Sequence, residues 1–494
     1  MPGAKVLIVG RGARDNALAH AYARSPHVDR VYVAPGNAGS EFLEKTARLG
    51  TSDIDALIGF AKKNDVSIVD VGSEEPLTIG RIVDRFHDAG FDRVVGQVSD
   101  AGILETSKCW AKEFFDRHGI PIPEYVNFDD PEEARRYISR FYGENPGENV
   151  VVKADGICGG KGSLVCDSLE QALIAVDRIM VKREFDSEEK GIRAGDRVVV
   201  ERRMHGIEMM FFVYTDGEAV KFAGTAYDLK RAYDHGHPHL TTRWFIENFG
   251  RFNPNTGGMI STSPHPYEEK FREETMETIA VPTLKIFQEE TGHRYTGVGY
   301  FGLMLSEEGG ELVPRVEEFN RRHGDPEGSS ILPRIETDYY ELMDSLLRGE
   351  LRNVDIEFSP VHTYALVAVS GPWVPAVGKR DDRFEYPGYP GDHHTNQPIN
   401  GLEDVDCLVY HSGTELDGDT LKTTGGRVLE IVGTGGSLEE AKADAEDNRR
   451  RVFFKGIRSR REHVEPEGMF RPHELTGWSS EEAYRRAYEK LEKY

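Results

Sequence analysis

The first hundred residues constrain the fold most, because short β-branched runs alternate there with helical stretches. The runs predict strands at 6–9, 30–33, 67–71 and 93–95, and the stretches between them predict helices at about 15–24, 54–64 and 81–89. Such βαβ alternation predicts a parallel, doubly wound sheet whose ligands bind at the carboxyl ends of the strands. We therefore expect an α/β fold class for this part of the chain.

The remaining 390 or so residues mix strands and helices less regularly. A second region opens near residue 104, and the strands predicted in it lie at 150–153, 198–201, 209–214 and 312–319. From about residue 360 short β runs follow at 363–369, 407–411 and 428–432, and then a helix at about 438–451. The last residues, 472–494, are typical of an amphipathic helix or a frayed tail.

Composition and charge exclude several classes of protein. The 494 residues carry a formal net charge of −24, which argues against general nucleic-acid binding because that needs a basic surface. No apolar run approaches the ~18–20 residues of a membrane helix, and the first residues do not resemble a secretory signal. Four scattered cysteines fit neither a disulfide framework nor a zinc site. We therefore expect a cytoplasmic protein with no membrane partner.

The strongest local motif is the glycine-rich segment 151–162, Val-Val-Lys-Ala-Asp-Gly-Ile-Cys-Gly-Gly-Lys-Gly. A strand presents Lys153, and a loop follows that carries Gly156, Gly159, Gly160, Lys161 and Gly162. Glycines let the backbone approach phosphate oxygens, and lysines supply positive charge. The pattern is not a Walker A loop, and the alternative is a hairpin with solvated lysines. We favour phosphate binding.

The second strong motif is the segment 316–325, Val-Glu-Glu-Phe-Asn-Arg-Arg-His-Gly-Asp. In a strand, Glu318 and Asn320 point to one face, and their oxygens are the hard ligands that Mg²⁺ prefers. Glu317 would point to the other face, so we interpret it as structural. Arg322, just beyond, suits a phosphate or a substrate carboxylate.

Weaker signals lie at the strand ends of the first region and between the two strong motifs. The turn at Gly10 and Gly12 could bind an anion through its amides, although a tight turn without a ligand is equally compatible with it. Asn37, Gly39 and Glu74 end neighbouring strands and could line the same crevice. The segment 253–258 is predicted to be a turn-rich loop with free amides. The histidines at 235, 237 and 239 are not expected to bind metal, because the segment is loop-like and lacks cysteine.

The order of these motifs resembles an ATP-grasp domain, and several stretches resemble the phosphoribosylamine–glycine ligase family (glycinamide ribonucleotide synthetases). The stretches that carry this resemblance are 6–10, 33–39, 152–156, 160–162, 254–259, 318–327 and 425–429. The resemblance runs in order from residue 4 to about residue 460. The segments 12–15 and 72–76 depart from the usual family sequences, and so does the residue after Glu201.

The resemblance implies a domain order. It consists of a Rossmann-like domain (1–103), an ATP-grasp core (104–130 and 196–335) with a mobile lid (131–195), a small C-terminal α/β domain (336–470) and a helical tail (471–494). The core itself would be α+β. ATP would lie between lid and core together with Mg²⁺ or Mn²⁺.

The resemblance also implies roles for individual residues. The expected catalytic residues are Arg322, Asp228 and Lys161, with Arg322 and Asp228 near the amino acid. The expected nucleotide-binding residues are Lys108, Lys153, Gly159, Gly160, Lys161, Gly162, Glu201 near adenine and Glu208 near ribose. The expected substrate-binding residues are Gly10, Gly12, Asn37, Gly39, Glu74, Asn255, Thr256, Gly257 and Asp325. The expected metal ligands are Glu318 and Asn320.

The implied reaction joins glycine to 5-phosphoribosylamine through a glycyl phosphate, in purine biosynthesis. Two alternatives remain open at this stage. One is a related carboxylate–amine ligase with a different acceptor or amino acid, and the other is a regulatory ATP-binding protein without catalysis. We expect a monomer or a homodimer.

Overall fold

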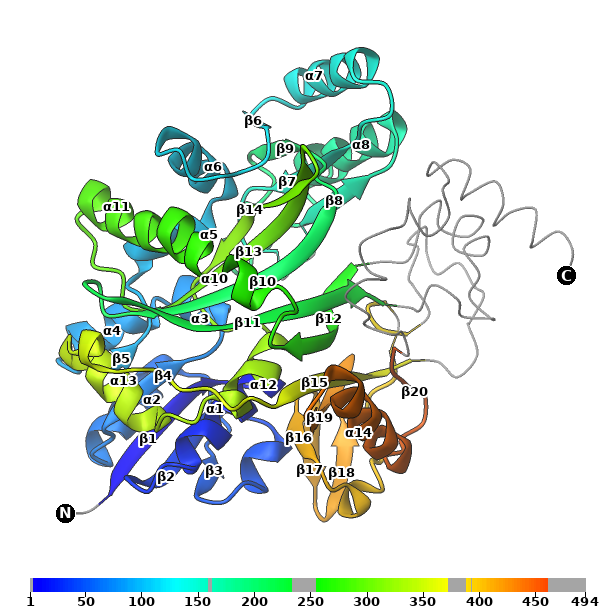
Figure 1. Ribbon diagram of the computed structural model, residues 1–494. Helices are drawn as coiled ribbons and strands as arrows, with labels where there is room; N and C mark the ends of the chain where they lie inside the picture. Colours follow the sequence, from blue (N-terminus) through cyan, green and yellow to red (C-terminus); the bar gives the residue numbers. More distant parts are fainter. Residues whose placement is uncertain (1–2, 159–161, 233–254, 372–387, 392, 461–494) are drawn as a thin grey trace, which may run out of the picture.

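The structure is a computed structural model that describes residues 3–158, 162–232, 255–371, 388–391 and 393–460. It contains a parallel sheet near the N-terminus, a small four-stranded sheet and a long sheet that lies between them and continues into the C-terminal region (Figure 1). The predicted helical tail, the three histidines at 235–239 and the segments 233–254 and 372–387 lie outside the described residues.

The N-terminal unit confirms the predicted α/β alternation. Its five strands are all parallel, in the order β3-β2-β1-β4-β5. They are β1 (Ala4–Gly10), β2 (Val28–Pro35), β3 (Thr46–Arg48), β4 (Ile68–Val71) and β5 (Val94–Val95), with helices α1 (Ala13–Ala23), α2 (Ile54–Lys63), α3 (Glu74–Thr78) and α4 (Ile82–Asp88). Strand β3 was not predicted. Glu74, predicted to end the preceding strand, begins helix α3 instead.

The four-stranded unit contains the glycine-rich segment. Its strands pair in the order β6-β9-β7-β8, all antiparallel. They are β6 (Tyr125–Phe128), β7 (Val150–Ala154), β8 (Ser163–Cys166) and β9 (Val198–Arg202), with helices α7 (Pro131–Glu144) and α8 (Leu169–Val176). Both helices bury apolar side chains in one cluster with the sheet. Because β6 and β9 belong to this sheet, the unit extends beyond the predicted range 131–195 at both ends.

The long sheet has nine strands in the order β14-β13-β10-β11-β12-β15-β19-β16, with β20 paired to β15. They are β10 (Gly206–Thr215), β11 (Val220–Arg231), β12 (Asn255–Ser263), β13 (Gly297–Glu308), β14 (Glu311–Asn320), β15 (His362–Ser370), β16 (Leu408–His411), β19 (Arg427–Gly435) and β20 (Ile457–Arg458). The prediction of a loop at 253–258 was wrong from Asn255 onward, because this segment pairs antiparallel with β11.

Helices cover this sheet and connect it with the other units. They are α5 (Ile103–Thr106), α6 (Lys108–Arg117), α10 (Glu268–Thr275), α11 (Val281–Thr291), α12 (Glu327–Ile331), α13 (Tyr339–Arg348) and α14 (Leu438–Arg451). Near the C-terminal end, β17 (Thr414–Asp417) and β18 (Thr420–Thr423) form a separate hairpin. Among the described residues, no helix has both the length and the apolar character needed to cross a lipid bilayer.

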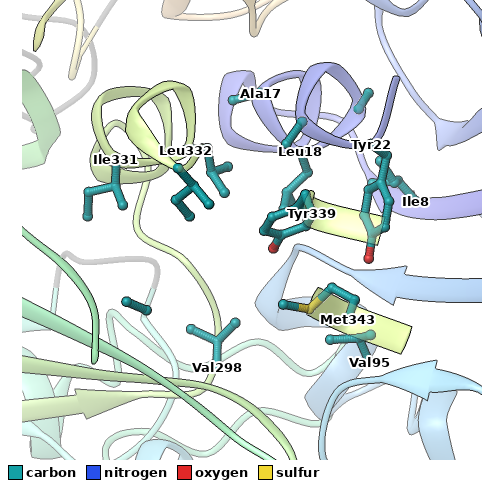
Figure 2. Packing of buried hydrophobic residues seen from close by; sticks show 14 of the residues in the cluster. Ile8, Ala17, Leu18, Tyr22, Val95, Val298, Ile331, Leu332, Tyr339 and Met343 are labelled. Carbon is teal, nitrogen blue, oxygen red and sulfur yellow. The ribbon is translucent and has the colours of Figure 1, made fainter. Parts of the chain in front are cut away.

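One hydrophobic cluster joins the N-terminal unit to the long sheet. Figure 2 shows Leu18 and Tyr22 of α1 near Leu332 and Tyr339, with Met343 of α13 close by. These side chains are buried, and burial of each contributes roughly 1.5–3 kcal/mol to stability. Helix α13 therefore packs against the N-terminal unit, although the predicted C-terminal domain included it. This packing fixes the crevice between the two units.

Candidate functional site

A cavity of about 810 Å³ lies among the N-terminal unit, the four-stranded unit and the long sheet. This volume is in the range of known small-molecule sites. Fourteen of the residues that the sequence predicted line it: Gly10, Glu74, Lys108, Lys153, Gly162, Glu208, Asp228, Asn255, Thr256, Gly257, Glu318, Asn320, Arg322 and Asp325. Segments as distant as residues 10 and 325 thus meet at one site.

Four predicted site residues do not line the cavity: Gly12, Asn37, Gly39 and Glu201. The amide of Gly12 donates to Asp15 Oδ2 at 2.7 Å, so it is occupied within the protein. The Asn37 side chain donates to two backbone carbonyls, one of them that of His411, and accepts from the Gly39 amide. It therefore fastens the N-terminal unit to β16, and its role in substrate binding stays a prediction. Gly159, Gly160 and Lys161 lie outside the described residues.

Lysines gather at the end of the cavity that faces the four-stranded unit. The buried Glu201 carboxylate pairs with Lys153 Nζ at 2.7 Å and with Lys112 Nζ at 3.0 Å. Burial opposes the charged forms, but the two lysines still keep the pKa of Glu201 below its usual value. Lys108 Nζ donates to the carbonyl of Gly156 in the glycine-rich loop at 2.8 Å. Glu201 thus positions the lysines, and its placement beside adenine stays a prediction.

The predicted metal pair lies at the end of β14. Glu318 and Asn320 share a face, with Glu318 Oε1 3.5 Å from Asn320 Nδ2. Burial raises the pKa of Glu318, but Lys230, Lys153 and other nearby cations outweigh it and hold that pKa below its usual value. An ionised carboxylate and an amide oxygen fit a magnesium ion that takes its other ligands from phosphates and water.

The interpretation of Glu317 was wrong. The pairing of β13 with β14 shifts between Gly302–Glu318 and Leu303–Val316, so Glu317 lies in a β-bulge. A bulge breaks the alternation of side chains, and Glu317 lines the cavity together with Glu318. Burial, and after it the charge of Glu208, raise the pKa of Glu317 to about 7. Simple two-residue periodicity could not have revealed this.

Asp228 is a buried carboxylate on β11 that lines the cavity. Within the described part of the chain, neither of its oxygens has a hydrogen-bond partner. Burial and the nearby Glu327 raise its pKa well above the usual value. Gly258 makes room for this arrangement, because a Cβ there would lie 2.2 Å from Pro326 and 2.9 Å from Asp228 Oδ1. An acid of this kind is suited to bind a cationic group of a ligand.

Arg322 faces the cavity close to two acids. Its Nη2 lies 2.8 Å from Glu74 Oε2, and its Nε lies 3.8 Å from Glu105 Oε1. Glu74 stands at the start of α3, and Glu105 belongs to α5. Arg322 therefore connects the N-terminal unit with the long sheet, and it is a cation that an anionic substrate can reach.

The opposite end of the cavity combines residues from three distant segments. Asp325 Oδ1 lies 2.9 Å from Arg427 Nη2, and Asp325 Oδ2 accepts from the Arg14 amide at 3.3 Å. Burial opposes ionisation, but Arg427 and Arg14 hold the pKa of Asp325 at about 2. Behind it, burial and the charge of Asp325 raise the pKa of Glu430 well above its usual value. Asp325 is thus an anion that holds Arg427 at the cavity wall.

Sequence reasoning missed several residues that line the cavity: Arg14, Glu105, Lys112, Lys230, Tyr300, Glu317, Glu327 and Arg427. Some had a signal. Arg14 follows the first glycine turn, Lys230 lies in the segment 228–231, and Arg427 lies in the motif 425–429. Tyr300 had none, and its hydroxyl donates to Glu327 Oε1 at 2.9 Å.

The residues present fit the nucleotide and metal that the motifs imply. Lys108 and Lys153 lie at the glycine-rich loop, where phosphates would bind, and Glu318 and Asn320 lie on the neighbouring strand. Among the described residues, no cluster of three or more His, Cys, Asp or Glu side chains is arranged to hold a metal ion. A metal at Glu318 and Asn320 would therefore depend on phosphate oxygens to complete its coordination.

Family models and known proteins agree on one relationship. Three domains of phosphoribosylglycinamide synthetase match this chain: the N domain at residues 4–105, the ATP-grasp (A) domain at 106–328 and the C domain at 386–462. A phosphoribosylamine–glycine ligase of Archaeoglobus fulgidus is 43% identical over 485 residues, covering 92% of this chain and 98% of the relative. The Vibrio cholerae ligase is 36% identical, covering 93% and 97%.

Solved structures place the fold in the same group. The phosphoribosylamine–glycine ligase of Thermotoga maritima superposes with a TM-score of 0.70 at 27% identity, covering 92% of this chain and 99% of that one. A biotin carboxylase of Campylobacter jejuni superposes with a TM-score of 0.63 at 14% identity, covering 97% and 98%. The second likeness shows the ATP-grasp fold alone. The predicted fold class is confirmed.

Proposed function

The chain belongs to the phosphoribosylglycinamide synthetase family, and from this premise we propose that it ligates glycine to 5-phosphoribosylamine at the cavity described above. The ligation uses ATP with Mg²⁺ or Mn²⁺ and yields glycinamide ribonucleotide, ADP and phosphate. This is a step of purine biosynthesis.

One observation carries the assignment of glycine. The cavity presents a buried carboxylate without a hydrogen-bond partner in the described chain, Asp228, and a cation, Arg322. A zwitterionic amino acid supplies the complement of both, its ammonium to Asp228 and its carboxylate to Arg322. The lack of a side chain at Gly258 lets the backbone approach Pro326 and Asp228 closely.

The chemistry then follows from position and charge. A carboxylate oxygen of glycine attacks the γ-phosphorus, ADP leaves, and a glycyl phosphate results. The amine of phosphoribosylamine attacks the carbonyl carbon, and inorganic phosphate leaves. Lys108 and Lys153 would neutralise phosphate charge, Glu318 and Asn320 would hold the metal, and Lys161 is expected to add a further positive charge at the phosphates.

We assign the phosphoribosylamine to the end of the cavity that contains Arg14 and Arg427. These two cations, beside the backbone of Asn255, Thr256 and Gly257, suit a phosphate monoester. Gly10 and Asp325 line the same end.

We propose that the four-stranded unit acts as a lid. Lys190, within this unit, pairs with Glu75 of α3 at 2.7 Å across the cavity mouth, and both line the cavity. Through this ion pair the proposed lid contacts the N-terminal unit. ATP is expected to protect residues 131–195 from a protease, and equal cleavage with and without ATP would contradict lid closure. We also propose a cytoplasmic monomer or homodimer that does not bind nucleic acid.

ADP release, measured with Mg²⁺-ATP and each substrate singly and together, tests the function. Turnover that requires both glycine and phosphoribosylamine supports it. Turnover with another acid or amine instead would assign a related ligase, and nucleotide binding without turnover would assign a regulatory protein.

A further inference from the structure

Two consecutive arginines after β14 have different surroundings. Arg322 lines the cavity and its side chain is 15% exposed, whereas Arg321 does not line it and its side chain is 1% exposed. Gly102 makes the space for the Arg321 guanidinium, because a Cβ at Gly102 would lie 2.1 Å from Arg321 Nη1. Arg321 is thus held behind the cavity wall, where no substrate reaches it.

The two arginines share one carboxylate. Glu105 Oε2 lies 3.3 Å from Arg321 Nε, and Glu105 Oε1 lies 3.8 Å from Arg322 Nε. Arg322 also pairs with Glu74 at 2.8 Å. The four side chains alternate in sign, in the order Arg321, Glu105, Arg322, Glu74, and the closer contact of Glu105 is with the arginine behind the wall.

Arg321 balances the charge of Glu105. Without Arg321, Arg322 would stand between two acids. The three side chains Arg322, Glu105 and Glu74 would then carry one excess negative charge where an anionic substrate arrives. In a buried site such an excess is poorly screened, so it would weaken the binding of a carboxylate. With Arg321 present, Glu105 is balanced from behind. Burial raises the pKa of Glu105, and the charges of Arg322, Arg321 and Lys108 oppose that rise.

We propose that Arg321 is a positioning residue that restrains Glu105 from behind the cavity wall and so leaves Arg322 free to bind the carboxylate of the amino-acid substrate. This inference rests on the proposed function, because it takes the substrate of Arg322 to be glycine. It assigns Arg321 no contact with any reacting atom.

The test is a double-mutant cycle on the full chain. Arg321→Met is expected to raise the KM for glycine about tenfold, because the interaction energy between coupled buried charges corresponds to a change in KM of about this size. It should change kcat and the KM for ATP less than about twofold. Arg321→Lys keeps the charge and should preserve most of the glycine affinity. Glu105→Gln in the Arg321→Met background should return the KM for glycine to that of Glu105→Gln alone. Arg334→Met, at another buried arginine, is the control, and should lower stability without raising that KM selectively.

Several results would overturn the proposal. An unchanged KM for glycine in a folded Arg321→Met protein is one, and a rise that Glu105→Gln fails to reverse is another. If Arg321→Met does not fold, Glu105→Gln alone still decides, because releasing Arg322 should lower the KM for glycine, and an unchanged or higher KM contradicts the inference. A wild-type chain that makes no ADP with glycine and phosphoribosylamine would instead refute the proposed function, so the two failures are distinguishable.

Discussion

The two ends of the cavity are built differently. At the end that faces the four-stranded unit, Lys112 and Lys153 surround Glu201, so acid and cations balance locally. At the other end, Asp325 is balanced by Arg427, and burial raises the pKa of the Glu430 carboxyl behind it well above its usual value. The first end is suited to a polyanion such as the phosphates of a nucleotide, and the second holds a small number of charges in fixed places.

The two ends also differ in how far they can be predicted from the sequence. Lys153 and the glycine-rich segment lie in one short motif, and so do Glu318 and Asn320, so local spacing exposes them. Asp325, Arg14 and Arg427 come from three segments separated by about a hundred residues or more, and only the fold brings them together. Substitutions at the two ends should therefore affect different kinetic constants.

The largest effect is expected at the metal pair. Glu318→Ala should lower kcat by about a thousandfold, because it removes a charged ligand of the metal that neutralises the reacting phosphates. Steady-state ADP release at saturating substrates measures it. Glu311→Ala, an exposed glutamate at the start of the same strand, is the matched control and should keep its activity. Near-normal turnover of Glu318→Ala would refute the metal assignment.

A smaller effect is expected at Asp228, which lies between the two ends of the cavity. Asp228→Asn should raise the KM for glycine about a hundredfold, because a charged partner of the ammonium is lost. Asp228→Asn is compared with Asp355→Asn, a substitution of a fully solvated aspartate on the surface.

The same aspartate predicts a pH dependence of the KM for glycine. Since burial raises the pKa of Asp228, its ionised fraction grows as the pH rises, and only the ionised form attracts an ammonium. The KM for glycine should therefore fall as the pH rises through the raised pKa of Asp228, as long as the amine of glycine keeps its proton. The Asn variant should lose this dependence. A flat profile in the wild-type chain would contradict the role of Asp228.

The smallest effect is expected at the acceptor end. Arg427→Met should raise the KM for phosphoribosylamine about tenfold and leave those for ATP and glycine nearly unchanged, because one charged hydrogen-bonding group is lost. Arg450→Met, on the exposed face of α14, is the control. The thermal unfolding midpoint must be recorded for both, because Arg427 also donates to the carbonyls of Gly257 and Asp325. Equal increases in all three KM values would show that Arg427 only stabilises the fold.

Much of the fold was predictable, and the failures have physical causes. The strands of the first hundred residues follow from β-branched runs between helices, and α14 occurs where it was predicted, since Ser437 caps its start. The segment from Asn255 was assigned to a loop because Asn, Thr and Gly favour turns, but pairing with β11 overrides that preference. The inward placement of Glu317 depends on a bulge opposite Leu303, which no local pattern reveals.

The sequence by itself was enough to predict the chemistry of the phosphate end. Motifs of fewer than fifteen residues bring lysines, glycines and the predicted metal ligands to spacings that a strand and a loop can turn into a site. The tertiary structure alone decided the acceptor end and the charge balance around Arg322. These depend on Arg14, Glu105 and Arg427 approaching from separate elements, and such contacts are set by the packing of whole units, as in the cluster that joins α1 to α13.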